Sequence, residues 1–290
     1  MGASDVVPGV SGGTMAFILG IYEELIRAIR SFDLNFIRLL LSRKIGDAIE
    51  YASCRFLVAV GLGIFIAIFS LARALSWLLE NQPVLIWSFF FGLILASILV
   101  VNRYLNQWNL SISVWILMGT VGAYLLIGIV PVSTPNSPWF LFLSGAIAIC
   151  AMILPGISGS FILVLLGKYH YFLEAVNNWD LFTLILGAAG AGFGLITFVR
   201  LLNWLLKRHH DLIIAVLIGL MLGSLRKVWP WKMTLENVTG SHGDIISITQ
   251  SNVLPQQWNY EVVTAICLMV VGFLVIIFLN TLSEKMDDRQ

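Results

Sequence analysis

Two short segments of this 290-residue sequence place proline, glycine and serine in the same order, Pro8-Gly-Val-Ser11 and Pro155-Gly-Ile-Ser158. Proline fixes φ and has no N–H group, glycine permits positive φ, and serine is a favoured N-cap. Each segment should therefore break a helix and leave N–H groups unpaired where the next helix begins. Such N–H groups and the helix dipole attract phosphate or carboxylate groups. The sequence thus predicts an anion site.

The predicted substrate-binding residues lie in these segments and directly after them, where N–H groups and hydroxyls could meet an anion. They are Ser11, Gly12, Gly13, Thr14, Ser158, Gly159 and Ser160. The alternative is a pair of tight turns whose small residues only allow close helix packing. Because the segments form a symmetric pair, and paired broken helices form the sites of many transporters, we favour the binding interpretation.

The two segments belong to a longer internal repeat. The offset of 147 residues between Pro8 and Pro155 also relates Gly9 to Gly156, Ser11 to Ser158, Gly12 to Gly159, Gly20 to Gly167, Tyr22 to Tyr169 and Asp33 to Asp180. A second offset of 127 residues relates Arg73 to Arg200, Trp77 to Trp204 and Gly92 to Gly219. An extra segment rich in Arg and Lys, at about 35–55, explains the change of offset. Because the matched residues occur in the same order in both halves, they indicate a duplicated unit.

Three ionisable residues could act on a bound anion or on its transport. Arg73 and Arg200 are candidate clamps, because a guanidinium can bind phosphate through two hydrogen bonds. Their places near helix ends beside tryptophan also suit arginines that anchor a helix at the membrane interface, and both interpretations stay open. Asp5 precedes the first segment and is the candidate coupling site, for a proton or sodium.

We expect no catalytic residue, no metal site and no cofactor. The three cysteines stand far apart, and the four histidines lack the spacing of metal ligands.

The composition assigns the chain to a bilayer. Hydrophobic residues make up 59% of the sequence and charged residues only 11%, whereas soluble domains are about 25% charged. A water-soluble protein is therefore excluded. The net charge is +1 and the basic residues lie mostly between apolar runs, so we expect no nucleic-acid partner.

Six apolar runs are long enough to cross the hydrocarbon, which takes about 20 residues. They are 56–79, 84–101, 111–130, 181–206, 212–228 and 260–280. Two further apolar stretches, 6–29 and 140–176, are interrupted by the Pro-Gly segments. Irregular backbone at membrane depth must be surrounded by protein or water. These two stretches are therefore predicted to be re-entrant hairpins.

Positive charges set the orientation, because cytoplasmic loops carry an excess of Lys and Arg. Segment 27–55 carries five arginines and one lysine and should be cytoplasmic. A hairpin that turns back at Pro155 keeps Lys207 and Arg208 on the cytoplasmic side. Three spans separate the two hairpins, and this odd number inverts the second unit relative to the first. Three cations nevertheless fall near the outer face, against this rule: Arg226, Lys227 and Lys232.

We therefore expect an all-α integral membrane protein, multi-pass and built as an inverted repeat. Each half would have one re-entrant helical hairpin plus three transmembrane helices. The first membrane repeat would be 1–130, with a basic cytoplasmic insertion at about 35–55. The second, inverted repeat would be 139–280, with an external loop at about 232–257.

The sequence around both segments is similar to the bacterial polyprenyl-phosphate transporter family, long catalogued as a membrane domain of unknown function. The resemblance lies in Asp5-Val-Val-Pro-Gly-Val-Ser-Gly-Gly-Thr14 and in Pro155-Gly-Ile-Ser-Gly-Ser160, and it extends over nearly the whole chain. It implies translocation, or flipping, of undecaprenyl phosphate across the bacterial cytoplasmic (inner) membrane, which recycles the carrier lipid of cell-envelope synthesis. That family usually has apolar residues before the aspartate motif, so we expect the start of this chain to be trimmed or assigned differently.

Two rival functions stay open. The second segment also resembles the loop of undecaprenyl-pyrophosphate phosphatases. Those enzymes, however, have an arginine where this chain has Gly159, and no glutamate cluster stands at membrane depth for acid–base catalysis. A secondary transporter of a small anion would use the same helix starts but need a closed, water-filled path. We favour a carrier, not an enzyme, that binds the lipid phosphate between the two segments and exposes it to each leaflet in turn.

Overall fold

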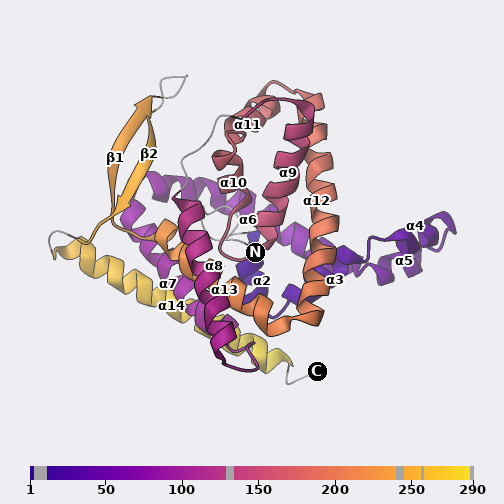
Figure 1. Cartoon of the computed structure of the whole chain (residues 1–290), viewed down its shortest axis with the longest axis horizontal. Coiled ribbons are helices and arrows are strands. Elements are labelled where there is room, and N and C mark those ends of the chain that lie inside the picture. The colour runs from indigo at the N-terminus through magenta and orange to yellow at the C-terminus, as the bar shows by residue number, and fades with distance from the viewer. Residues whose placement is uncertain (3–11, 129–133, 240–244, 256–257, 288–290) are drawn as a thin grey trace.

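The computed structural model describes residues 1–2, 12–128, 134–239, 245–255 and 258–287, and most of these residues are helical (Figure 1). The helices of the first half are α2 Gly12–Ile18, α3 Tyr22–Arg30, α4 Leu34–Leu41, α5 Ile45–Tyr51, α6 Cys54–Asn81, α7 Pro83–Asn102 and α8 Leu110–Ile127. The later elements are α9 Pro138–Ile153, α10 Gly159–Leu165, α11 Tyr169–Asn177, α12 Leu181–Arg208, α13 His210–Val228, β1 Lys232–Thr239, β2 Ile245–Asn252 and α14 Tyr260–Asp287.

Within these described residues, five helices are long and apolar enough to cross a membrane. They are Cys54–Leu71 of α6, Pro83–Asn102, Leu110–Ile127, Leu181–Arg208 and Tyr260–Leu282. The prediction of a helical membrane protein is confirmed. The sixth predicted run, 212–228, does form helix α13, but it is not among the five, because this short helix carries three charged residues at its ends, Asp211, Arg226 and Lys227.

Local sequence explains where several helices begin. Pro83 and Pro138 occupy the first turns of α7 and α9, where a missing N–H group costs nothing. Asn109 caps α8 by accepting a hydrogen bond of 2.8 Å from the N–H of Ile112. Asp33 and Asp180 cap α4 and α12 through their carboxylates. These five helices therefore start at residues suited to that position.

Helices α2 and α10 end in the same way. Each is followed by a glycine in the left-handed region, Gly20 with φ 70° and Gly167 with φ 63°. In each, the residue after that glycine donates its N–H to a carbonyl five residues earlier, Ile21 to Ala16 and Lys168 to Leu163. This is a helix C-cap that favours glycine, because glycine adopts positive φ without steric cost.

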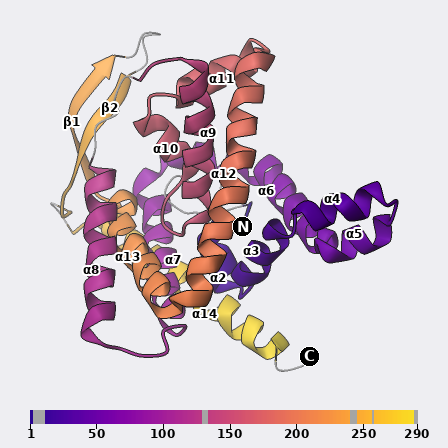
Figure 2. The same ribbon diagram turned by 45° about the vertical axis from the view of Figure 1, so that its right-hand side comes forward.

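The long helices pack across the two halves of the sequence. Helix α8 runs along α13, and α14 runs along α7 (Figure 2). A Cβ atom at Gly119 would lie 2.7 Å from the carbonyl oxygen of Val216, and one at Gly219 would meet the carbonyl oxygen of Ile116 even more closely. Glycine thus lets the two backbones touch, as is common between membrane helices.

The α7–α14 contact is built in the same way. A Cβ atom at Gly92 would collide with the carbonyl oxygen of Met269, and one at Gly272 would collide with that of Phe89. The central core joins both halves, since buried Ile94 and Ile98 of α7 belong to one cluster with Ile214 and Met221 of α13.

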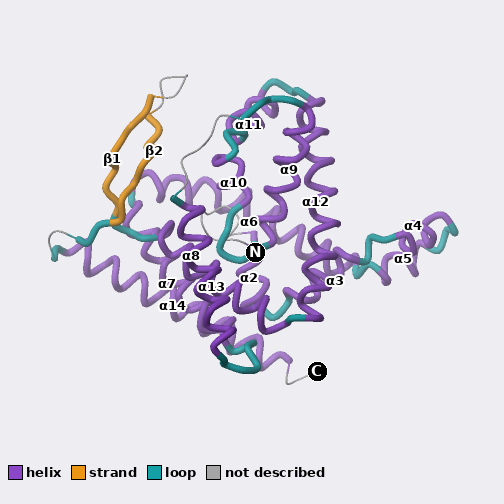
Figure 3. Tube along the Cα trace, viewed as in Figure 1, coloured by secondary structure: helices purple, strands orange, loops and turns teal. Residues whose placement is uncertain are grey.

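Two segments leave the helical body. Helices α4 and α5 extend to one side and carry the basic insertion predicted at about 35–55 (Figure 1). The segment expected to be an external loop at about 232–257 contains an antiparallel hairpin, orange in Figure 3, in which Lys232 pairs with Asn252. Its base is tied to α13, because Trp229 Nε1 donates to the Val253 carbonyl (2.8 Å) and Asn252 Nδ2 donates to the Arg226 carbonyl (2.9 Å).

We expect Gly119→Ala to weaken the α8–α13 contact, because the added methyl group would press on backbone that cannot move away locally. The expected cost is about 1–3 kcal/mol, as for other overpacked contacts. Thermal unfolding of the purified protein in detergent would measure it. Gly122→Ala is the matched control, since a Cβ atom there meets nothing within 4 Å. Equal melting temperatures for the two variants would contradict the close approach.

Candidate functional site

The second Pro-Gly segment forms the turn of a helical hairpin between α9 and α10. Pro155, Gly156 and Ile157 are buried, and Gly156 has φ +88°. A Cβ atom at Gly156 would lie 3.1 Å from both the Leu220 carbonyl oxygen and the Met221 Cα. We call residues 155–160 the second corner. It lies directly against α13, and glycine is needed there both for its φ and for its small size.

Two hydroxyl groups lie at the end of the second corner. Ser158 is the N-cap of α10, and its Oγ accepts a long hydrogen bond of 3.4 Å from the N–H of Phe161. Its Oγ is also 2.6 Å from the Oγ of exposed Ser160, so the two hydroxyls share a hydrogen bond. The N-cap is as expected, but the N–H of Phe161, expected to be unpaired, is used by that cap.

Helix α10 has only seven residues. Only a few aligned peptide units can contribute to its dipole, which therefore supplies less charge than the sequence pattern suggested. The chemistry of this corner rests mainly on the two hydroxyls and on backbone N–H groups, which can donate to an anion.

The first Pro-Gly segment, which includes Ser11, lies outside the described residues, and so does Asp5. The structure describes Gly12 and Gly13 as the buried start of α2, which also has seven residues. Thr14 follows in the same helix, but the position of its side chain is outside the description. The structure therefore locates α2, the helix that follows the first segment, but not the segment itself.

That helix and its successor reach the second corner. Tyr22, at the start of α3, is buried, and its Oη donates a hydrogen bond of 3.4 Å to the carbonyl of Ile153, the last residue of α9. Helix α2 contacts α9 as well, and Ala16 packs in the same cluster as Ile153 and Leu154. Figures 1 and 2 both draw α2 beside the turn between α9 and α10. The structure thus brings the two helices that follow the first segment close to the second corner.

The two candidate arginines are less informative. Arg73 lies in α6, but its side chain is outside the description. Arg200 is exposed on α12. The pKa of Asp33 is lowered, first by the hydrogen bond from the Phe36 N–H and, as a smaller effect, by the charge of Arg200. Arg200 therefore faces the beginning of α4, and no contact with Ser158 or Ser160 is recorded among the described residues.

One lysine, Lys227, lies beside the second corner, and two further cations are its neighbours, Arg226 in the chain and Lys232 through a hydrogen bond. Sequence reasoning did not assign these cations to the site. Lys227 Nζ lies 5.2 Å from the ring centre of Phe161, the residue after Ser160. Lys232 Nζ donates to the Lys227 carbonyl (2.6 Å) and lies 4.5 Å from the Trp87 ring centre. We call Arg226, Lys227 and Lys232 the basic cluster. Its sequence signal was the excess of cations near the predicted outer face.

The sequence of this chain is similar to those of known proteins. Residues 1–246 match the model of a family described as undecaprenyl phosphate translocase-like. The chain is 41% identical to a polyprenyl-phosphate transporter of Vibrio cholerae, over 98% of this chain and 94% of that protein. It is 31% identical to a polyprenyl-phosphate transporter of Staphylococcus aureus, over 79% of this chain and 83% of that protein. No solved structure matches the chain.

We expect stability to rise with pH because of Lys232. Burial, and then the charge of Lys227, lowers the pKa of Lys232 to about 8, whereas an unfolded lysine has a pKa of about 10.4. Between these values the unfolded chain holds a proton that the folded chain lacks, so the free energy of unfolding increases with pH. Thermal unfolding in detergent between pH 7 and 10 would show this as a rising melting temperature.

Lys232→Met should reduce that rise, whereas Lys207→Met, which removes an exposed lysine of α12, should leave it in place. The same pH slope in wild type and in Lys232→Met would contradict the shifted pKa of Lys232.

Proposed function

The chain belongs to the undecaprenyl phosphate translocase-like family, and from this premise we propose that it moves undecaprenyl phosphate across the membrane as a lipid carrier. The names of both relatives support this substrate class. The observation that carries the proposal is the second corner, where a helix breaks inside an apolar body and presents Ser158 and Ser160 beside the basic cluster. The phosphate needs such polar partners, whereas the polyprenyl tail does not.

We propose that the carrier consists of two inverted halves, 1–130 and 139–280, each with one re-entrant hairpin and three spans. The glycine contacts support a duplication. Gly92 and Gly219, which correspond at the offset of 127 residues, each touch the last long helix of the opposite half. The matching ends of α2 and α10 are further support. Inverted halves would let one central site open to either side.

In this proposal the phosphate binds between the second corner and the first Pro-Gly segment. Ser158, Ser160 and the start of α10 would donate hydrogen bonds from one side, while Ser11, Gly12, Gly13 and Thr14 would donate from the other. The contact of Tyr22 with Ile153 supports this pairing, because it joins the first hairpin to the entrance of the second corner. The tail would stay among lipid acyl chains while the headgroup moves.

The two arginines and Asp5 have separate proposed roles. Arg73 and Arg200 would attract the phosphate from a distance, since Arg200 is exposed. Asp5 would bind a coupling proton or sodium ion, a proposal that rests on its place just before the first Pro-Gly segment. Carboxylates within membrane segments are costly and therefore usually mark ion or proton pathways.

We propose that the protein spans the bacterial cytoplasmic membrane and performs no hydrolysis. Both relatives are named transporters, and Gly159 stands where the phosphatases with a similar loop have an arginine. The pyrophosphatase alternative is tested directly. Release of inorganic phosphate from undecaprenyl pyrophosphate by the purified protein would favour the enzyme, whereas saturable binding of undecaprenyl phosphate without turnover favours the carrier.

We expect Ser158→Ala/Ser160→Ala to lower the rate of undecaprenyl phosphate translocation by at least about tenfold, because two hydrogen bonds to a charged group are lost. A leaflet-resolved assay in proteoliposomes, with and without ion gradients, measures the rate. Ser113→Ala on exposed α8 is the matched control. A wild-type rate in the folded double variant would remove both serines from the site, and a wild-type rate in Arg200→Ala would remove that arginine.

A further inference from the structure

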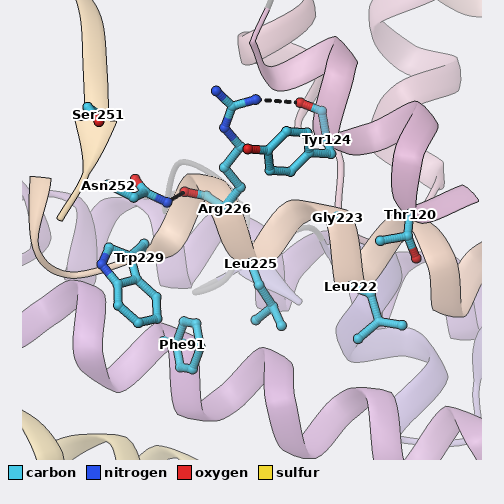
Figure 4. Close-up of a pocket in the computed structure, with 10 residues that line it drawn as sticks. All are labelled: Phe91, Thr120, Tyr124, Leu222, Gly223, Leu225, Arg226, Trp229, Ser251 and Asn252. Atoms are coloured by element: carbon cyan, nitrogen blue, oxygen red, sulfur yellow. Dashed lines mark hydrogen bonds between the residues drawn. The ribbon is translucent and has the colours of Figure 1, made fainter. Parts of the chain in front are cut away.

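A cavity of about 550 Å³ lies beside the end of α13, between α8 and the base of the β hairpin (Figure 4). Its apolar walls include Phe91, Leu222 and Trp229, and its polar lining residues include Arg226 and Asn252. Within the described part of the chain, no Asp or Glu lines it. A cavity with one cation and apolar walls suits a ligand that is anionic at one end and apolar at the other.

The guanidinium of Arg226 is held but not neutralised. Its Nη1 donates to the Tyr124 carbonyl (2.8 Å), and the guanidinium lies 4.1 Å from the Tyr124 ring centre. Figure 4 shows this single bond from one nitrogen, with the other terminal nitrogen pointing away from the tyrosine. A guanidinium has five N–H donors. Arg226 is thus oriented by Tyr124 and retains donors for a ligand.

The other two cations of the basic cluster are held in the same manner. Lys227 lies over Phe161 and Lys232 over Trp87. Aromatic faces attract a cation but carry no net charge. Among the described residues, none of these cations forms an ion pair with a carboxylate. Lys232 reaches the backbone carbonyl of Lys227, and Arg226 precedes Lys227 in α13. This part of the fold thus carries three positive charges without a described counter-charge, and an anion there would be attracted to them.

The simpler explanation is that these cations cap α13, because cations are favourable at a helix C-terminus. Lys232 does donate to the carbonyl of Lys227 in the last turn. Arg226, however, donates to a carbonyl of α8, not of its own helix, and Lys227 leans toward α10. Capping therefore explains one of the three cations and leaves the other two.

We propose that this cavity and the basic cluster receive the phosphate monoester of a membrane lipid before it reaches the second corner. Arg226 would bind the phosphate, the apolar walls would hold the first part of the tail, and Lys227 would pass the headgroup toward Ser160. The path from Lys227 to the second corner is short, since Lys227 contacts Phe161, the residue next to Ser160. The identity of the lipid as undecaprenyl phosphate rests on the proposed function, but the phosphate site does not.

The test uses the full chain in nanodiscs of zwitterionic lipid and measures equilibrium binding of two probes, undecaprenyl phosphate and phosphatidic acid. R226Q/K227Q should bind both at least about tenfold more weakly, because charge-assisted hydrogen bonds are lost. K207Q/R208Q removes the same charge from the exposed end of α12 and should bind within about twofold of wild type, as expected for remote exposed charges. K227R, which keeps the charge, should bind better than K227Q.

Several results would overturn the proposal. One is wild-type affinity in a folded R226Q/K227Q, and another is an equal loss of affinity in K207Q/R208Q. Equal losses in K227R and K227Q would also contradict it. Binding of inorganic phosphate as tight as that of either lipid would assign the site to the free ion. Wild type that binds phosphatidic acid through Arg226 and Lys227 but neither binds nor translocates undecaprenyl phosphate would support this site and refute the proposed function.

Discussion

A phosphate group inside a membrane protein needs polar partners, because unpaired charge is costly in hydrocarbon. In this structure polar groups are exposed by breaking a helix. The left-handed Gly156 turns the chain against α13, and the break then presents the hydroxyls of Ser158 and Ser160 at the start of α10. The break is possible only because the turn is buried in protein, where Pro155, Gly156 and Ile157 contact neighbouring helices and not lipid.

The same corner depends on contacts between distant parts of the chain. Tyr22 reaches the carbonyl of Ile153, and the third long helix of each half packs on the second long helix of the other through glycines. Neither half has this arrangement alone, since each supplies one side of the α8–α13 and α7–α14 contacts. Motion of one half relative to the other would therefore change the surroundings of the corner directly, which is the physical requirement for alternating exposure.

The basic cluster is an exception to the charge bias that is usual in membrane proteins. Cations near the outer face oppose the usual charge bias, and sequence reasoning treated Arg226, Lys227 and Lys232 only as a difficulty for the orientation. Their side chains are held by Tyr124, Phe161 and Trp87, which come from three other helices. This fixed placement without a described carboxylate is the basis of the phosphate site that we propose beside the base of the hairpin.

The sequence by itself determined the membrane-embedded helical class, most helix positions and the break at Pro155, because apolar run length, prolines and N-caps act locally. It also identified Ser158 as an N-cap. It could not show that Arg200 faces Asp33, that residues 232–252 pair as strands, or that Lys227 meets Phe161. Those facts depend on how helices pack, and packing is decided by shape and contact between residues far apart in the chain, which local patterns do not encode.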